Sequence, residues 1–114
     1  MVIKICYIDT ETTGTSYNRN GLIQIAGMIY YITDNKYEKK REFNFKLGTF
    51  EDDVVEDEAL KINGVTREEI LAYPDPTKVY KELSGIFGEY CDKYNKEDKM
   101  FFVGYNSRFD YDFI

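Results

Sequence analysis

The stretch Ile8-Asp9-Thr10-Glu11-Thr12-Thr13-Gly14 continues a short apolar run and closes it with a Thr/Gly cluster. This pattern predicts a strand over residues 2–11 that is buried on both faces and central in its sheet. Side chains alternate along a strand, so Asp9 and Glu11 point to the same side. Two carboxylates on one face repel each other and are costly to desolvate, and a divalent cation offsets both effects. Mg²⁺, a hard ion that takes oxygen ligands, is the natural candidate.

The acidic pair has two other interpretations. In the first, Asp9 and Glu11 are solvated acids at a strand end. In the second, they open a calcium loop of the EF-hand type, which needs a Glu at its twelfth position and flanking helices. That position is Asn20, and the preceding segment has the pattern of a strand, so the calcium loop is set aside.

Length and composition restrict the possible functions. A chain of 114 residues is one domain, large enough for a single core but small for a complete enzyme. Its net charge of -6 argues against a broad basic surface for nucleic acid, although a metal-bridged active site escapes that objection. The sequence holds no His, which excludes a His-based zinc site and a Ser-His triad. Without a membrane-spanning apolar run or a signal peptide, we expect a cytoplasmic protein with no membrane contact.

The rest of the chain predicts three further strands and three helices. The residues at 34–36 form a turn, so the strands at 22–32 and 38–46 should pair antiparallel. A short helix should end at Asn63-Gly64, a second should begin at Thr66 and stop before Pro74, and a third, with one apolar stripe, should open at Asp75-Pro76. The strand at 100–105 follows a helical crossover, so we expect it to lie parallel to the first.

A second informative stretch, residues 104–114, reads Gly-Tyr-Asn-Ser-Arg-Phe-Asp-Tyr-Asp-Phe-Ile. Asn106 or Ser107 caps a predicted helix that starts near Arg108, with Asp110 in its first turn. If the first and fourth strands are adjacent, Asp110 approaches Asp9 and Glu11. A purely structural role for Asp110, as a partner of the helix dipole, is the alternative.

The two stretches together resemble the first and second motifs of the DnaQ-like DEDD exonuclease superfamily. The segment Ala59-Leu60-Lys61-Ile62-Asn63-Gly64-Val65-Thr66 is also similar to that family, in particular to the proofreading epsilon subunits and exonuclease domains of bacterial DNA polymerase III. The resemblance spans essentially the whole chain. It implies an α/β fold of the ribonuclease-H-like type, in which a mixed sheet of three antiparallel strands and a parallel fourth has flanking helices. It also implies metal-dependent removal of nucleotides from the 3′ end of DNA or RNA.

Roles for individual residues follow from the same resemblance. Asp9 would bridge two Mg²⁺ or Mn²⁺ ions, Glu11 would ligate one, and Asp110 would support the other; these three are the expected catalytic and metal-binding residues. Two such ions hold the attacking water and the departing oxygen in line. The residues expected to contact the substrate are Thr10, Thr12, Thr13, Gly14, Asn63, Asn106 and Phe109.

The sequence departs from the family after the second motif. The third motif, with a fourth acid and a His or Tyr base, does not occur, so residues 1–114 are interpreted as the N-terminal portion of a truncated domain, inactive alone. The expected partners are a single-stranded nucleic acid with a free 3′ end, a polymerase in a proofreading role, and a neighbouring chain that completes the core. A catalytically dead nucleic-acid-binding or interaction module of the same fold is the alternative. A nuclease that cuts internally is disfavoured by the Thr12-Thr13-Gly14 loop.

Overall fold

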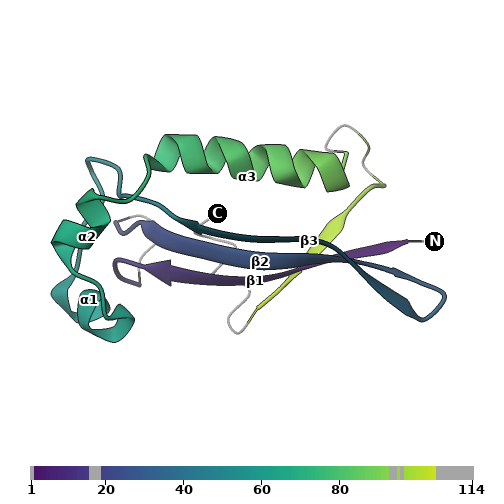
Figure 1. Cartoon of the computed structure of the whole chain (residues 1–114), viewed down its shortest axis with the longest axis horizontal. Coiled ribbons are helices and arrows are strands. Elements are labelled where there is room, and N and C mark those ends of the chain that lie inside the picture. The colour runs from purple at the N-terminus through teal and green to yellow at the C-terminus, as the bar shows by residue number, and fades with distance from the viewer. Residues whose placement is uncertain (1, 16–18, 93–94, 96, 105–114) are drawn as a thin grey trace.

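The structure is a computed structural model that describes residues 2–15, 19–92, 95 and 97–104. Its centre is a four-stranded sheet with the order β3-β2-β1-β4. The strands are β1 (Ile3–Thr12), β2 (Leu22–Thr33), β3 (Lys36–Lys46) and β4 (Met100–Val103). β1 pairs antiparallel with β2, β2 antiparallel with β3, and β1 parallel with β4. The predicted mixed sheet is therefore confirmed (Figure 1).

The described residues form three helices, whose ends coincide with capping residues. α1 (Asp57–Asn63) closes on Gly64, whose φ of 68° is the left-handed conformation that the Asn-Gly pair predicted. α2 (Arg67–Leu71) begins after Thr66, whose side chain accepts a hydrogen bond from the Glu69 amide. α3 (Pro76–Tyr90) begins after Asp75, whose carboxylate caps the Thr77 amide at 2.8 Å. None of the described helices is long and apolar enough to span a membrane.

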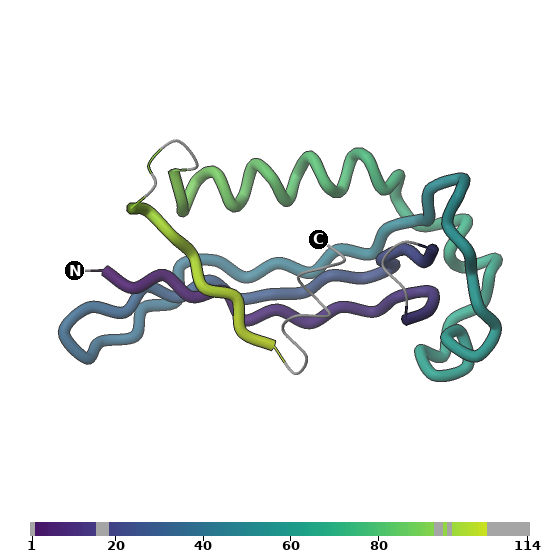
Figure 2. Tube along the Cα trace, turned by 180° about the vertical axis from the view of Figure 1, so that it is seen from behind, coloured from purple at the N-terminus to yellow at the C-terminus, as the bar shows by residue number. Residues whose placement is uncertain are grey.

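The core lies between α3 and one face of the sheet. α3 runs along that face, whereas α1 and α2 gather at the end where β1 stops (Figures 1 and 2). The buried stripe of α3 packs against alternate residues of the strands, and the members of this cluster are Cys6, Ile8, Leu22, Ile25, Ile29, Phe43, Leu47, Val79, Leu83 and Ile86. A smaller cluster of Ile23, Leu60 and Ile70 joins α1 and α2 to the sheet end.

One expectation about β1 is wrong. The strand is central, but only one of its faces is buried: Cys6 and Ile8 lie under α3, whereas Ile3 and Asp9 on the alternate positions are exposed. None of the described helices covers that second face (Figure 2). Residues such as Ile5 and Tyr7 suit either environment, so the apolar run did not distinguish one buried face from two.

Candidate active site

Asp9 and Glu11 occupy alternate positions of β1, as their spacing predicted. In the ladder with β2, Asp9 lies opposite Ala26 and Glu11 opposite Gln24. Ile8, which precedes Asp9, is buried beneath α3, so the alternation of the strand turns Asp9 and Glu11 to the other face of the sheet. Hydrogen bonds to β2 fix this part of the strand, so both acids have a rigid backbone support.

A cavity of about 430 Å³ lies on this face beside Asp9. Its other walls include Ala26 and Met28 of β2, Asn44 of β3, and Gly104, which follows β4. Because β4 pairs parallel to β1 with Val103 opposite Tyr7, the chain leaves β4 next to Asp9. Gly104, where the second informative stretch begins, therefore lies beside Asp9 of the first, whereas the predicted approach of Asp110 falls on residues outside the described part of the chain.

A second cavity, of about 810 Å³, lies where β1 ends. One wall is formed by Thr10, Glu11, Thr12, Gly14 and Thr15, and the other by Val55 to Ala59, Ile62, Asn63 and Arg67. Ile62, in α1, is 81 % exposed and forms part of this second wall. The side-chain amide of Asn63 donates to the Thr12 carbonyl oxygen at 2.9 Å and so fixes α1 to the end of β1.

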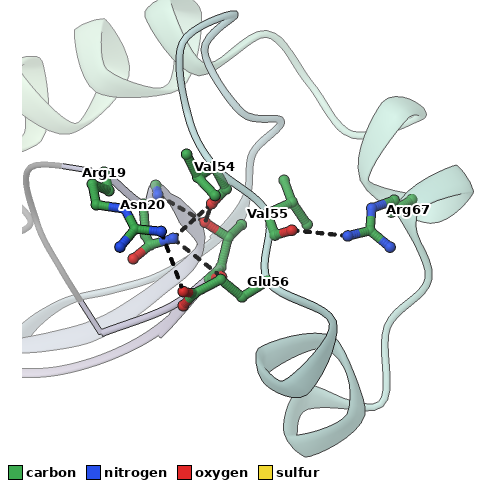
Figure 3. A network of polar contacts seen from close by, with 8 residues as sticks. Arg19, Asn20, Val54, Val55, Glu56 and Arg67 are labelled. Atoms are coloured by element: carbon green, nitrogen blue, oxygen red, sulfur yellow. Dashed lines mark hydrogen bonds and ion pairs between the residues drawn. The ribbon is translucent and has the colours of Figure 1, made fainter.

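The loop between β1 and β2 is tied to residues 54–56 by a buried polar network. Thr13 donates its hydroxyl hydrogen to the Val54 carbonyl oxygen at 2.7 Å, and Asn20 donates to the same oxygen at 2.7 Å. The Glu56 amide donates to the Thr13 carbonyl oxygen at 2.9 Å. Figure 3 shows Asn20 directed at Val54, and Arg19 beside Glu56. These bonds make the loop a defined wall of the cavity.

Two arginines extend this network at the surface. Arg19 lies 3.7 Å from the Glu56 carboxylate in an exposed ion pair. Arg67, the first residue of α2, donates to the Val55 carbonyl oxygen at 2.8 Å (Figure 3). It also forms an ion pair with Asp57. Exposed pairs of this kind contribute little to stability, at most ~1 kcal/mol. Their effect here is to orient the segment between the loop and α1.

The predicted site residues divide into three groups. Asp9 and Glu11 share one face, and Thr10, Thr12, Gly14 and Asn63 line the second cavity. Thr13 is fully buried, and its hydroxyl is bonded to Val54 and Gly21. The residues Asn106, Phe109 and Asp110 lie outside the described part of the chain. Among the described residues, no cluster of three or more acids, Cys or His forms a metal site, so convergence of three carboxylates stays a prediction.

Sequence reasoning did not identify Asn20, Glu56, Ile62 and Arg67 as parts of the site. In the sequence, Asn20 stands out only as the twelfth position of a calcium-loop pattern, and a polar residue in a polar loop carries no signal of burial. Ile62 has the spacing of a helix core residue, and its exposure depends on how α1 is placed. Each of these positions acquires its role from contacts with distant segments.

The mixed sheet with an acidic pair at the end of its central strand has the fold of ribonuclease-H-like exonucleases. The RNase_T exonuclease family model matches residues 6–114, and the chain belongs to this family. No curated protein matched the chain. The finer resemblance to proofreading subunits of DNA polymerase III stays a prediction.

Solved structures of exonuclease I from E. coli share the fold. The complex with a dT13 oligonucleotide superposes with a TM-score of 0.73 at 22% identity, covering 97% of this chain and 22% of that chain. The complex with dA16 gives a TM-score of 0.72 with the same identity and coverage. A zinc-bound form of the exonuclease I complex with single-stranded DNA matches at 20% identity, with a TM-score of 0.72 and the same coverage. The chain thus corresponds to about a fifth of the length of these proteins.

Proposed function

We propose that this chain contributes the first part of the active site of a metal-dependent nuclease that removes nucleotides from the 3′ end of a single strand. The observation that carries the proposal is the placement of Asp9 and Glu11 on one face of β1, each lining a cavity. Both cavities adjoin segments that carry the family's motifs. The similarity to exonuclease I bound to dT13 and dA16 supports a single-stranded substrate.

The donor set fits a divalent metal in its chemistry. Asp9 and Glu11 offer carboxylate oxygens on adjacent same-side positions of a rigid strand, and such oxygens are the ligands that Mg²⁺ and Mn²⁺ prefer. When bound, the metal supplies charge neutralisation at the phosphate that reacts. We propose Asp110 as the third ligand on the basis of the family resemblance.

The second cavity fits the sugar and base of a terminal nucleotide better than a terminal phosphate. Its walls include the acids Glu11, Glu56, Asp57 and Glu58, whereas Arg67 is the one cationic residue among the described residues of the wall and is already paired with Asp57. A terminal phosphate dianion at this position would be repelled. Exposed Ile62 offers apolar surface to a base. We therefore propose that the enzyme requires a 3′ hydroxyl and releases nucleotides from that end.

The test uses the complete protein that contains this chain. Asp9→Asn should lower the release of nucleotides from a 3′-labelled single strand by at least a thousandfold while the protein stays folded, because the substitution removes a metal ligand and relieves carboxylate repulsion. Asp34→Asn is the matched control. Asp34 lies in the turn after β2, roughly 25 Å along the strand from the partner of Asp9, and its φ of 45° suits Asn.

Three measurements distinguish this proposal from the alternatives. Mn²⁺ should raise the melting temperature of the wild type and of Asp34→Asn but not of Asp9→Asn. Strands ending in a 3′ phosphate, and closed circular single strands, should resist degradation. Wild-type protein that binds a single strand without degrading it in Mn²⁺ would indicate the catalytically dead binding module, and efficient cleavage of the circle would indicate an internal nuclease. A comparison of DNA and RNA strands, and of frayed and paired ends, tests a proofreading role.

A further inference from the structure

Thr13 differs from its neighbours in the direction of its side chain. Thr12 and Gly14 line the second cavity, whereas Thr13 between them has no solvent exposure. A fully buried hydroxyl needs hydrogen-bond partners, because an unpaired one is costly. Thr13 has two: it donates to the Val54 carbonyl oxygen at 2.7 Å and accepts from the Gly21 amide at 2.9 Å. The side chain therefore joins three segments and leaves the cavity to its neighbours.

The hydroxyl of Thr13 takes the place of a backbone group. In a regular antiparallel pair, the Gly21 amide would donate to the Thr13 carbonyl oxygen, as the Thr13 amide does to the Gly21 carbonyl oxygen at 2.9 Å. Here the hydroxyl accepts from Gly21 instead, and the Thr13 carbonyl oxygen accepts from the Glu56 amide. The register of the two strands shifts at the neighbouring position, between Glu11 and Thr12. This exchange lets the chain leave the ladder and turn towards residues 54–56.

Asn20 completes the arrangement from the other side of the loop. Its side chain is buried and donates to the Val54 carbonyl oxygen at 2.7 Å and to the Thr13 carbonyl oxygen at 3.4 Å. The Val54 amide in turn donates to the Arg19 carbonyl oxygen at 2.6 Å. We call the side chains of Thr13 and Asn20, with their bonds to Val54, the loop clamp. It lies beneath the wall that Thr12 and Gly14 form.

We propose that Thr13 and Asn20 are positioning residues. Through the loop clamp they hold Thr12 and Gly14 in the wall of the second cavity, where the terminal nucleotide is proposed to bind, without contacting the substrate. This inference rests on the proposed function. The acidic pair does not depend on the clamp, since Asp9 and Glu11 are held by the ladder with β2. Loss of the clamp should therefore weaken binding of the strand and leave binding of the metal unchanged.

The experiment compares Thr13→Val, which keeps the shape and removes the hydroxyl, with Thr13→Ser, which keeps the hydroxyl. Thr33→Val, at the far end of β2, is the matched control. All three are made in the complete protein. Binding of a fluorescent oligothymidylate is measured by anisotropy in EDTA, where no metal-dependent cleavage occurs. KM and kcat are measured in Mn²⁺, and the Mn²⁺-induced rise in melting temperature reports the metal site.

Thr13→Val should raise the Kd and KM for the oligothymidylate on the order of tenfold, the effect of a lost hydrogen bond to a positioned wall. Thr13→Ser and Thr33→Val should stay within about twofold of the wild type, because neither loses the clamp. The Mn²⁺-induced shift should be the same in all four proteins. Unchanged Kd and KM in folded Thr13→Val would overturn the proposal, and so would an equal loss of the Mn²⁺ shift, which would indicate a general disturbance of the strand end.

A measurement on the wild type serves if Thr13→Val does not fold. The backbone amides of Gly21 and Glu56 both donate to Thr13. Their hydrogen exchange should slow when oligothymidylate binds, because a bound nucleotide stabilises the loop. Unchanged exchange at both amides in the saturated complex would overturn the proposal. A wild type that neither binds nor degrades the strand would refute the proposed function, and the positioning role with it, whereas failure of the clamp alone leaves nuclease activity intact.

Discussion

Replacing Gly14 by Ala is expected to be the most damaging single-methyl change in the loop. A Cβ atom at Gly14 would lie closer than 3.0 Å to the Glu56 carboxylate and to the side chain of Asn20. Glu56 is partly exposed and can swing aside, but Asn20 is buried and bonded to Val54. Overpacking costs ~1–3 kcal/mol and a lost buried hydrogen bond ~1 kcal/mol, so the free energy of unfolding should fall by about 2–4 kcal/mol.

Gly85 provides a matched control on the solvent side of α3. A Cβ atom there meets nothing within 4 Å, so Gly85→Ala should stabilise the protein by about 0.5–1 kcal/mol through helix propensity. Both substitutions remove the same freedom from the unfolded chain, so their difference reports the native state alone. With a slope of ~2 kcal/mol/M, the urea midpoints should differ by about 2 M.

The assay is equilibrium unfolding in urea followed by tyrosine fluorescence and circular dichroism. The chain contains eleven Tyr and no Trp, so tyrosine emission is the natural probe of this domain. Coincident transitions of the two probes establish that a single free energy of unfolding is defined. The close-packing account of Gly14 is refuted if Gly14→Ala unfolds at the same urea concentration as the wild type, or if the order of the two alanine variants is reversed.

Three further predictions concern residues away from the loop. The pKa of Asp98 is lowered by a backbone amide that donates to its carboxylate and by Lys4 at 2.6 Å. The contribution of Asp98 to stability is therefore present above its unfolded pKa of ~3.9 and is lost as the pH falls from there through the folded pKa. The pKa of Lys4 is raised, chiefly by its hydrogen bond to Asp98, so its contribution is present below ~10.4 and is lost as the pH rises through the folded value. Melting temperatures of Asp98→Asn and wild type should therefore differ between these limits and converge outside them, and a constant difference would contradict the pairing. Burial raises the pKa of Cys6 to about 12. At pH 8 iodoacetamide should therefore label half-buried Cys91 before Cys6, as followed by peptide mapping. Early labelling of Cys6 would contradict its burial. Leu83→Ala should lower the free energy of unfolding by about 2–5 kcal/mol in urea titrations, and a loss below ~1 kcal/mol would show that α3 packs loosely on the sheet.

The parts of the fold that local chemistry determines could be predicted from the sequence. Thr66, Asp75 and Gly64 act at helix ends through contacts with residues at most four positions away, so their capping roles follow from spacing alone. The crossover through α3 predicted that the fourth strand runs parallel to the first, and the structure confirms it. The shared direction of Asp9 and Glu11 followed from the period of a strand.

The parts that depend on distant contacts could not be predicted. Thr12 and Thr13 are neighbours of the same residue type, yet Thr12 lines a cavity and Thr13 is fully buried. The difference arises because the regular β1–β2 ladder ends here, after its register shifts between Glu11 and Thr12. The partner of Thr13, Val54, lies 41 positions away. The exposure of one face of β1 depends on which helices cover the sheet, and the apolar run carries no information about that.

The residues proposed to bind the metal and those proposed to hold the nucleic-acid strand have separate structural supports. The backbone that carries Asp9 and Glu11 is fixed by the regular ladder with β2, which tolerates many side chains. The wall formed by Thr12 and Gly14 is fixed by side-chain bonds to a segment outside the sheet, which tolerate few replacements. Substitutions in the β1–β2 ladder should therefore weaken binding of the metal and of the nucleic acid together, because the wall is attached to the end of β1. Substitutions in the loop clamp should weaken binding of the nucleic acid alone. This difference distinguishes a positioning network from a general contribution to stability.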